Sequence, residues 1–431
     1  MTNEQPETNE PTPTGRTGGD AAGAFATEPG AGMPRPLGAP RILEPFGAAP
    51  VRFDAKGANH ESPSWEKLVV LPLYLAVMVV IGAYLISSAH PVLGVCFILL
   101  ALLPVIANVL SAKRRLAGLV GRGDGAPASE GLGAWLSASA AVLRAWAPTL
   151  VGEEVDVLVR NRTAEAEATE AWLAGAGEPE RVETTSDDGT RLVGHALACN
   201  PGSGRWVVLA PGYRGSWRDG LLHARRYAEK GFNLLLVDMR GCGESAGEWF
   251  GLGWLDRRDL VAWSQWLAGR FGSDVRVVLH GTGMGGAAVL TAAAEGDLAP
   301  CVRAVCADSA WSDVWNVAVP LIAPDPKSSA HPLIDLMRLA LRLSPGGYDV
   351  ALARPEAAVA GSRVPVILMQ GDQDTVVPSY MAERLADACG GAASGSAHQL
   401  VLVEGAGHGE ACLADPVGYY WKLFTFLERY L

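Results

Sequence analysis

Short apolar runs alternate with helix-like segments over residues 176–431, and this alternation restricts the possible folds more than any other feature of the chain. Two such runs are WVVLA within 205–210 and LLLV within 232–238, and the stretch between them, at 219–230, has a helical pattern that stops at Gly231. Strands that alternate with helices form a parallel sheet covered on both faces. The sequence therefore predicts the α/β class, with any site at the carboxyl ends of the strands.

Further segments extend this pattern in both directions. A turn signal, DDG, separates two strand-like runs at 181–186 and 191–198 and predicts a β-hairpin. The remaining expected strands are 275–280, 302–308, 364–371 and 398–405, and the remaining expected helices are 254–271, a helix that follows 280 and ends near 294, and 416–430.

Two long runs without any charged residue precede this region, at 68–86 and 92–110. Each is close to the ~20 residues that a helix needs to cross the hydrocarbon layer of a bilayer. They predict a transmembrane hairpin over 66–112, and a buried hairpin in a soluble core is the alternative. The basic cluster at 113–115 follows the second run, and such clusters stay cytoplasmic. We therefore expect a two-span protein of the cell membrane, with the lipid bilayer as partner and the following domain in the cytoplasm.

Three other segments carry weaker signals. Residues 1–60 are rich in Pro, Gly, Ala, Thr and Glu, which predicts a disordered tail. Residues 113–175 are expected to form a linker with helical segments, among them an acidic helix at 163–175. The helix-rich segment from 311 to 355 forms either a cap over a pocket or a set of ordinary packing helices, and the sequence favours neither.

Five motifs follow one another in the predicted α/β domain at 176–431: APGYRGSWRDG (210–220), VDMRGCGES (237–245), GTGMGG (281–286), GDQDTVVP (371–378) and EGAGHG (404–409). They resemble those of the α/β-hydrolase superfamily, in particular the membrane-anchored bacterial serine hydrolases of the esterase and prolyl-peptidase-like group. The resemblance covers roughly 180–431, and it implies the α/β-hydrolase fold, a small acyl or peptide substrate or ligand, and no cofactor.

The motif GTGMGG has the frame of a nucleophile elbow, a tight turn between a strand and a helix that presents one side chain to the site. Gly281 and Gly285 supply the small residues on either side of the centre. By resemblance, Gly283 occupies the position of the family's serine, and the N–H groups of Met284 and Tyr213 are the oxyanion donors. Glycine has no atom that can attack a carbonyl group, so the nucleophile is missing at this position.

The other two members of a catalytic triad come from the last two motifs. By resemblance, Asp374 is the acid and His408 the general base, in the chain order of this superfamily. Asp372, two residues before the acid, is interpreted as a turn former. The chain also departs from the family at Pro211 and Gln370, where histidine is common, and backbone geometry can fulfil both of those roles.

No neighbouring residue is a convincing replacement for the serine. The side chain of Thr282 is expected to point away from the pocket, because an elbow directs only its central side chain outward. Cys242 and Ser245 belong to a glycine-rich turn, in which a serine usually has a structural role.

Composition excludes some functions and leaves two open. A formal net charge of −11 argues against nucleic-acid binding. The seven cysteines are scattered, so no metal site is predicted. Transport is disfavoured because neither apolar run contains an ionisable residue. One remaining hypothesis is a membrane-tethered ester, thioester or peptide hydrolase with an unusual nucleophile or a water activated by His408. The other is a pseudoenzyme that binds a ligand or a protein at the membrane.

Overall fold

The computed structural model describes residues 153–322, 333–344, 346–362, 364–390 and 397–431, together with residues 77–81, 83–84, 86–87, 92, 95 and 99. The predicted tail at 1–60, most of the predicted hairpin at 66–112 and most of the predicted linker lie outside the described residues. Within the ranges that are described, no helix is both long enough and apolar enough to cross a bilayer.

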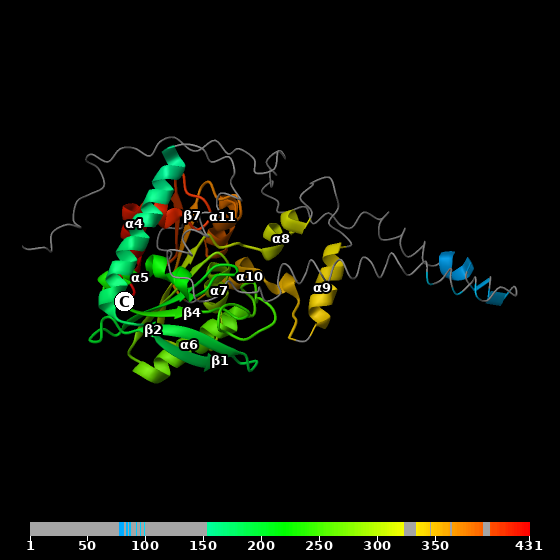
Figure 1. The fold of residues 1–431 in the computed structure, drawn as a ribbon, viewed down its shortest axis with the longest axis horizontal. Helices are drawn as coiled ribbons and strands as arrows, with labels where there is room; N and C mark the ends of the chain where they lie inside the picture. The colour runs from blue at the N-terminus through cyan, green and yellow to red at the C-terminus, as the bar shows by residue number, and fades with distance from the viewer. Residues whose placement is uncertain are drawn as a thin grey trace, which may run out of the picture. The chain divides into compact units, whose positions relative to one another are not determined.

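Eight strands of the described residues form one sheet in the order β1-β2-β4-β3-β5-β6-β7-β8. Figure 1 labels four of them, β1, β2, β4 and β7. β1 and β2 pair antiparallel, β2 pairs antiparallel with β4, and all other neighbours are parallel. Each predicted strand agrees with the observed one to within two residues at either end. The strands are β1 (Glu180–Thr185), β2 (Arg191–Leu197), β3 (Arg205–Ala210), β4 (Asn233–Val237), β5 (Arg276–Thr282), β6 (Val302–Asp308), β7 (Val366–Gly371) and β8 (Gln399–Val403).

The register of the parallel strands brings their carboxyl ends to one edge of the sheet. Ala210 of β3 pairs with Gly281 of β5, and Thr282 of β5 pairs with Asp308 of β6. Residues that follow these strands are therefore neighbours in space although they are far apart in the sequence. This edge holds all the motifs that the resemblance singled out.

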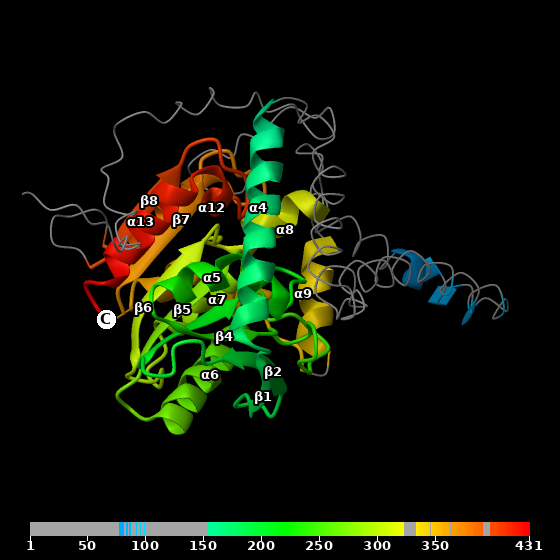
Figure 2. The same cartoon turned by 60° about the vertical axis from the view of Figure 1, so that its left-hand side comes forward.

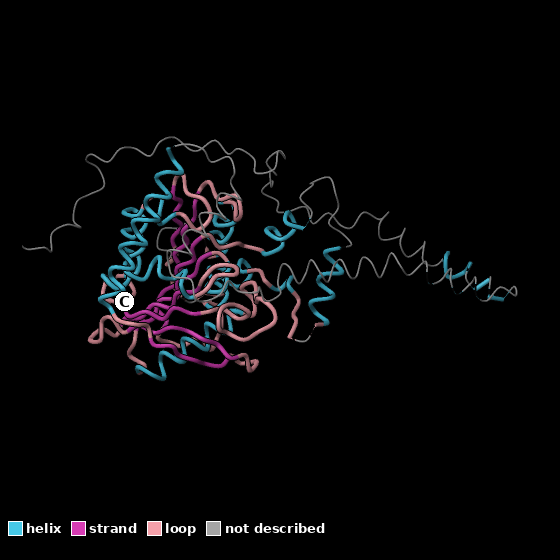
Figure 3. Tube along the Cα trace, in the orientation of Figure 1, coloured by secondary structure: helices cyan, strands magenta, loops and turns pink. Residues whose placement is uncertain are grey.

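Helices cover both faces of the sheet (Figure 3). One apolar cluster lies between the sheet and helices α6, α7, α10 and α11, and a second lies between the sheet and helices α5, α12 and α13. Figure 2 shows α4, α5 and α13 in front of the strands. The helices are α4 (Glu153–Ala176), α5 (Leu221–Glu229), α6 (Asp256–Phe271), α7 (Met284–Ala292), α8 (Val314–Ile322), α9 (Leu333–Leu343), α10 (Pro355–Val359), α11 (Ser379–Ala388), α12 (Ala411–Ala414) and α13 (Pro416–Leu427), with short 3₁₀ turns at Trp217–Gly220 and Val350–Leu352.

Helix α4 packs on the domain, whereas the sequence prediction began the α/β domain at residue 176. The carboxylate of Glu165 accepts hydrogen bonds from the guanidinium groups of Arg225 and Arg226 on α5. On the same helix, one turn before Glu165, the Asn161 amide donates to the Leu413 carbonyl at 2.8 Å. The packed region of the described chain therefore extends into the segment that the sequence predicted to be a linker.

The segment between β6 and β7 contains helices α8 and α9, as its composition predicted. Trp315, Met337 and Leu341 are buried in the same apolar cluster as α7. On the opposite side of α9, Leu339 and Leu343 are exposed. These helices therefore pack on the core through one face, while the choice between a cap and plain packing helices stays open.

Candidate functional site

A sharp turn joins strand β5 to helix α7, and Gly283 is its central residue. Gly283 has φ 55° and ψ −112°, a conformation that costs a non-glycine residue about 1–3 kcal/mol. The flanking glycines allow the close approach of two backbones. A Cβ at Gly281 would lie 2.2 Å from the carbonyl carbon of Gly285, and one at Gly285 would lie 2.3 Å from the carbonyl oxygen of Ala210. Packing of the backbone therefore sets the geometry of the turn.

A histidine and an aspartate meet across from this turn. His408 Nδ1 lies 2.8 Å from Asp374 Oδ2, and the Asp374 side chain is fully buried. The other oxygen, Asp374 Oδ1, accepts the backbone N–H groups of Val376 and Val377 at 2.9 and 2.7 Å. These bonds fix the carboxylate in one orientation, and it orients the imidazole in turn.

Gln370 contributes to the same arrangement, which the sequence did not indicate. Its Nε2 donates to Asp374 Oδ2 at 3.0 Å and to the Val377 carbonyl at 2.9 Å. The one sign of this role in the sequence was that Gln370 stands where histidine is common in the family. The structure shows that the glutamine amide helps to hold the carboxylate.

The electrostatics favour a protonatable imidazole at 408. Burial is the largest single influence and lowers the pKa of His408, but the negative charge of Asp374 and the hydrogen bond to it raise the pKa, and the net result of all neighbouring groups is a raised pKa. The carboxyl groups of Asp308 and Glu410 act in the same direction. The His408 imidazole therefore binds a proton more readily than an exposed histidine does.

The free nitrogen of His408 faces the central residue of the turn. A Cβ built on Gly283 would lie 3.1 Å from His408 Nε2 and 3.9 Å from the Cα of Gly212. A side chain at 283 would thus enter the space between the histidine and the loop after β3. The structure brings Gly283, Asp374 and His408 together at the edge where β5, β7 and β8 end.

The two expected oxyanion donors lie on the loop and the helix that flank this space. Met284 is fully buried and is the first residue of α7, where a backbone N–H has no partner within the helix. Tyr213 lies on the loop after β3, directly after Gly212. Its ring packs edge-on against the ring of Phe250, with the centroids 5.2 Å apart. Their assignment as oxyanion donors stays a prediction.

The three alternative nucleophiles have other surroundings. The Ser245 hydroxyl donates to the Asp238 carbonyl at 2.7 Å and accepts the Val193 N–H at 2.9 Å, which is a structural role. Cys242 is buried in the apolar cluster under α6 and α7. The Thr282 methyl group would lie 3.3 Å from a Cβ at position 409, so this side chain packs toward the histidine loop.

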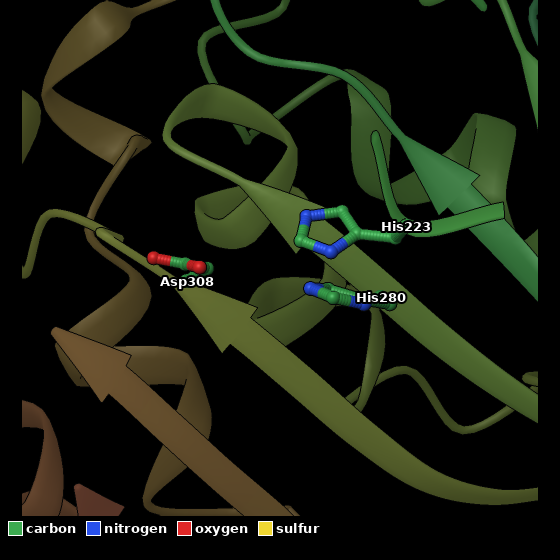
Figure 4. Close-up of side chains that lie close together, drawn as sticks. All are labelled: His223, His280 and Asp308. Carbon is green, nitrogen blue, oxygen red and sulfur yellow. The ribbon is translucent and has the colours of Figure 1, made fainter. Parts of the chain in front are cut away.

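A cluster of ligand-type side chains lies below the turn: His223, His280 and Asp308 (Figure 4). Their potential ligand atoms lie within 4.8 Å of one another, and all three side chains are buried. Tyrosine hydroxyl groups already contact potential ligand atoms of two of these side chains. The Tyr227 hydroxyl lies 3.0 Å from His280 Nδ1, and the Tyr419 hydroxyl donates to Asp308 at 2.8 Å. Burial lowers the pKa of His223 to about 4. We interpret the cluster as a hydrogen-bond network of the core and assign no metal to it.

Comparisons with known proteins agree with this topology. The model of the X-Pro dipeptidyl-peptidase (S15 family) matches residues 143–321, and the model of the TAP-like protein matches residues 347–422. A curated relative, the uncharacterized protein YfhR of Escherichia coli, is 29% identical over 216 residues. That match covers 48% of this chain and 66% of YfhR, so the chain spans slightly less than two thirds of the relative's length.

Solved structures give a more distant likeness. The esterase Pf2001 of Pyrococcus furiosus is 19% identical, with a TM-score of 0.46 over 59% of this chain and 93% of that one. A puromycin-hydrolyzing peptidase of Mycobacterium tuberculosis is 20% identical, with a TM-score of 0.43 over 57% of this chain and 39% of that one. At such identities these structures carry no information on activity. The sheet order and the two family models together show that the chain has the fold of the α/β-hydrolase superfamily.

Proposed function

We propose that this protein is a membrane-anchored α/β-hydrolase-fold protein of the ester, thioester or peptide hydrolase type, catalytically impaired because glycine occupies the nucleophile position. One observation carries the proposal. A side chain at position 283 would begin next to the histidine, because a Cβ built on Gly283 lies only 3.1 Å from His408 Nε2. This distance supports the proposal that the base and the turn form a triad whose nucleophile is absent.

The remaining groups would still act on a bound acyl compound. Asp374 orients His408, and the N–H groups of Met284 and Tyr213 would stabilise negative charge on a carbonyl oxygen. Without a serine, His408 can act only on a water molecule. Triad enzymes without their nucleophile keep a residual acceleration of about 10³–10⁴ over water, which comes from the oxyanion donors and substrate binding. We therefore expect feeble hydrolysis rather than none.

The membrane anchor is a proposal from the sequence, with modest support from the described residues. Those at 77–81, 83–84, 86–87, 92, 95 and 99 are helical. Among them, the large apolar side chains include Val80, Tyr84 and Val92, each more than 60% exposed. Exposed apolar side chains on a helix suit a lipid environment. With the basic cluster at 113–115, the hydrolase-fold domain would lie in the cytoplasm.

A pseudoenzyme is the second candidate, and the glycine at 283 favours it. In this role the groups around His408 and Gly283 would bind an acyl ligand or a peptide without cleaving it. Tight binding of an ester to the unaltered chain, without any turnover, would support this candidate. Appreciable turnover by the unaltered chain would contradict it.

Hydrolysis of aryl esters by three forms of the full chain tests the proposal. The unaltered protein and Gly283→Ala should both be slow, and Gly283→Ser should gain about 10²-fold or more, because a serine would meet a base already in place. Gly283→Ala is the matched control, since it adds the same Cβ in the same strained conformation without a nucleophile. If Gly283→Ser is no faster than Gly283→Ala, the proposed arrangement is wrong.

A further inference from the structure

Two residues that directly follow one another, Asp308 and Ser309, lie between the two halves of the candidate site. Both are fully buried. Ser309 has φ 53°, a left-handed conformation that is strained for any residue other than glycine. Glycine would adopt this conformation freely. The feature of serine that this position uses is therefore its hydroxyl group.

The hydroxyl group connects the end of β6 to the loop that carries the histidine. Ser309 Oγ donates to Asp308 Oδ1 at 2.8 Å and accepts the backbone N–H of Gly409 at 2.9 Å. Gly409 directly follows His408. On the other side, the Asp308 carbonyl accepts the N–H of Gly283 at 2.8 Å. One dipeptide thus holds both the central residue of the turn and the histidine loop.

A chain of buried groups keeps the Asp308 carboxylate in place. The Tyr419 hydroxyl donates to Asp308 Oδ2 at 2.8 Å, and its oxygen lies 3.4 Å from His280 Nε2. The Tyr227 hydroxyl lies 3.0 Å from His280 Nδ1. Burial lowers the pKa of His280 well below its usual value, so the ring is neutral, with one donor and one acceptor nitrogen. Figure 4 shows His280 and Asp308 on neighbouring strands below the turn.

We propose that Ser309, held by Asp308, is a positioning residue that sets the imidazole of His408 against position 283. The inference rests on the proposed role of His408 as the base. Its basis is that the Ser309 hydroxyl restrains the backbone at Gly409, and the backbone there fixes the direction in which the neighbouring imidazole leaves the loop. A misplacement of about 1 Å between reacting groups can cost about 100-fold in rate, so such a restraint affects catalysis.

The test measures the pKa of His408 in the full-length protein by hydrogen exchange at the imidazole C2 position, with peptide mass spectrometry. Ser309→Gly removes the hydroxyl group and keeps the backbone conformation unstrained. The expected result is a fall in the pKa of His408 toward its ordinary value, because the contact with Asp374 loosens. Faster amide exchange at 404–410 should accompany it. Ser309→Ala, which removes the same hydroxyl group, is a second variant and should have the same effect.

Ser245→Ala is the matched control. Ser245 is also fully buried, and its hydroxyl likewise makes one donated and one accepted hydrogen bond, to the Asp238 carbonyl and from the Val193 N–H. Its loss should lower stability by a similar amount without moving the pKa of His408. If the pKa of His408 in the Ser309→Gly protein equals that in the Ser245→Ala protein, the positioning role is overturned, whatever the activity of the two variants.

A second arm uses the Gly283→Ser protein. There Ser309→Gly should lower kcat for an aryl ester about ten- to hundredfold with little change in KM, whereas Ser245→Ala should not. The two proposals fail in different ways. A pKa shift at His408 without any gain from Gly283→Ser would refute the proposed function and support the positioning role. A gain from Gly283→Ser that Ser309→Gly leaves intact would refute the positioning role alone.

Discussion

The two halves of the candidate site differ in how completely the chain equips them. In one half, Asp374 accepts hydrogen bonds from two backbone N–H groups and an amide, and it contacts His408 at 2.8 Å. In the other half, the centre of the turn keeps a positive φ that would strain other residues, but the central residue is glycine. The close packing of Gly281 and Gly285 preserves this turn without help from a side chain. If the proposal is right, the backbone frame of a hydrolase site persists in this chain without its nucleophile.

The largest effect that would sharpen this comparison concerns the base. In the Gly283→Ser protein, His408→Ala should lower ester hydrolysis by about 10⁴-fold or more, because the serine and its base act as a unit. In the unaltered protein the same change should matter far less, since no nucleophile depends on the base. Steady-state rates with an aryl ester measure both. Equal losses in the two backgrounds would show that the halves do not cooperate.

The next prediction concerns the turn. Gly285→Ala should lower the free energy of unfolding by about 3 kcal/mol, because its Cβ would lie 2.3 Å from the backbone oxygen of Ala210. Gly283→Ala should cost less, about 1–3 kcal/mol, because its Cβ would lie no closer than 3.1 Å to the His408 side chain and 3.9 Å to the Cα of Gly212. Thermal melts in detergent measure both changes. A larger loss for Gly283→Ala would mean that the centre of the turn, and not its flanks, is the tightly packed part.

Much of the fold could be predicted from the sequence because local pattern determines it. The strand at 302–308 matches β6 at both ends, and the helix at 416–430 begins where α13 begins. Strand β5 was predicted to end at 280 and continues to Thr282, because the polar residues at its end still pair with β6. Apolar periodicity cannot detect such an extension.

The parts that the sequence did not predict depend on contacts between distant residues. The acidic helix at 163–175 was predicted, but its docking depends on Glu165 and two arginines about 60 positions away. The link from Ser309 to Gly409 spans 100 positions. The relation of Gln370 to the carboxylate of Asp374 is local, yet apart from its departure from the family's histidine nothing in the sequence distinguishes this amide from any other buried glutamine.

A smaller effect is expected at Gln370. Gln370→Leu keeps the volume and removes the donor to Asp374, so it should cost about 1–3 kcal/mol of stability. In the Gly283→Ser protein it should lower the rate several-fold, because Asp374 keeps its two backbone donors. Melts and rates measure these changes. A loss as large as that of Asp374→Asn would show that the amide, and not the backbone, holds the carboxylate.

The smallest expected effect is on pH dependence. Because Asp374 raises the pKa of His408, the folded state binds this proton more tightly than the unfolded state. The stabilisation is full below the unfolded pKa of about 6.5, and it is lost as the pH rises through the folded pKa. His408→Ala should therefore cost more stability near about pH 5 than near about pH 8. Urea unfolding at the two pH values checks the sign, and the opposite order would contradict the raised pKa.

The central claim is that the frame of a triad is present and its nucleophile is absent. Labelling by a fluorophosphonate probe, with mass spectrometry to locate the modified residue, tests it most directly. The account predicts that the unaltered protein and Gly283→Ala remain unlabelled, and that Gly283→Ser is labelled at residue 283 and loses this label when His408→Ala is added. Strong labelling of the unaltered protein, at Thr282, Cys242, Ser245 or elsewhere, would contradict the claim and identify the true nucleophile.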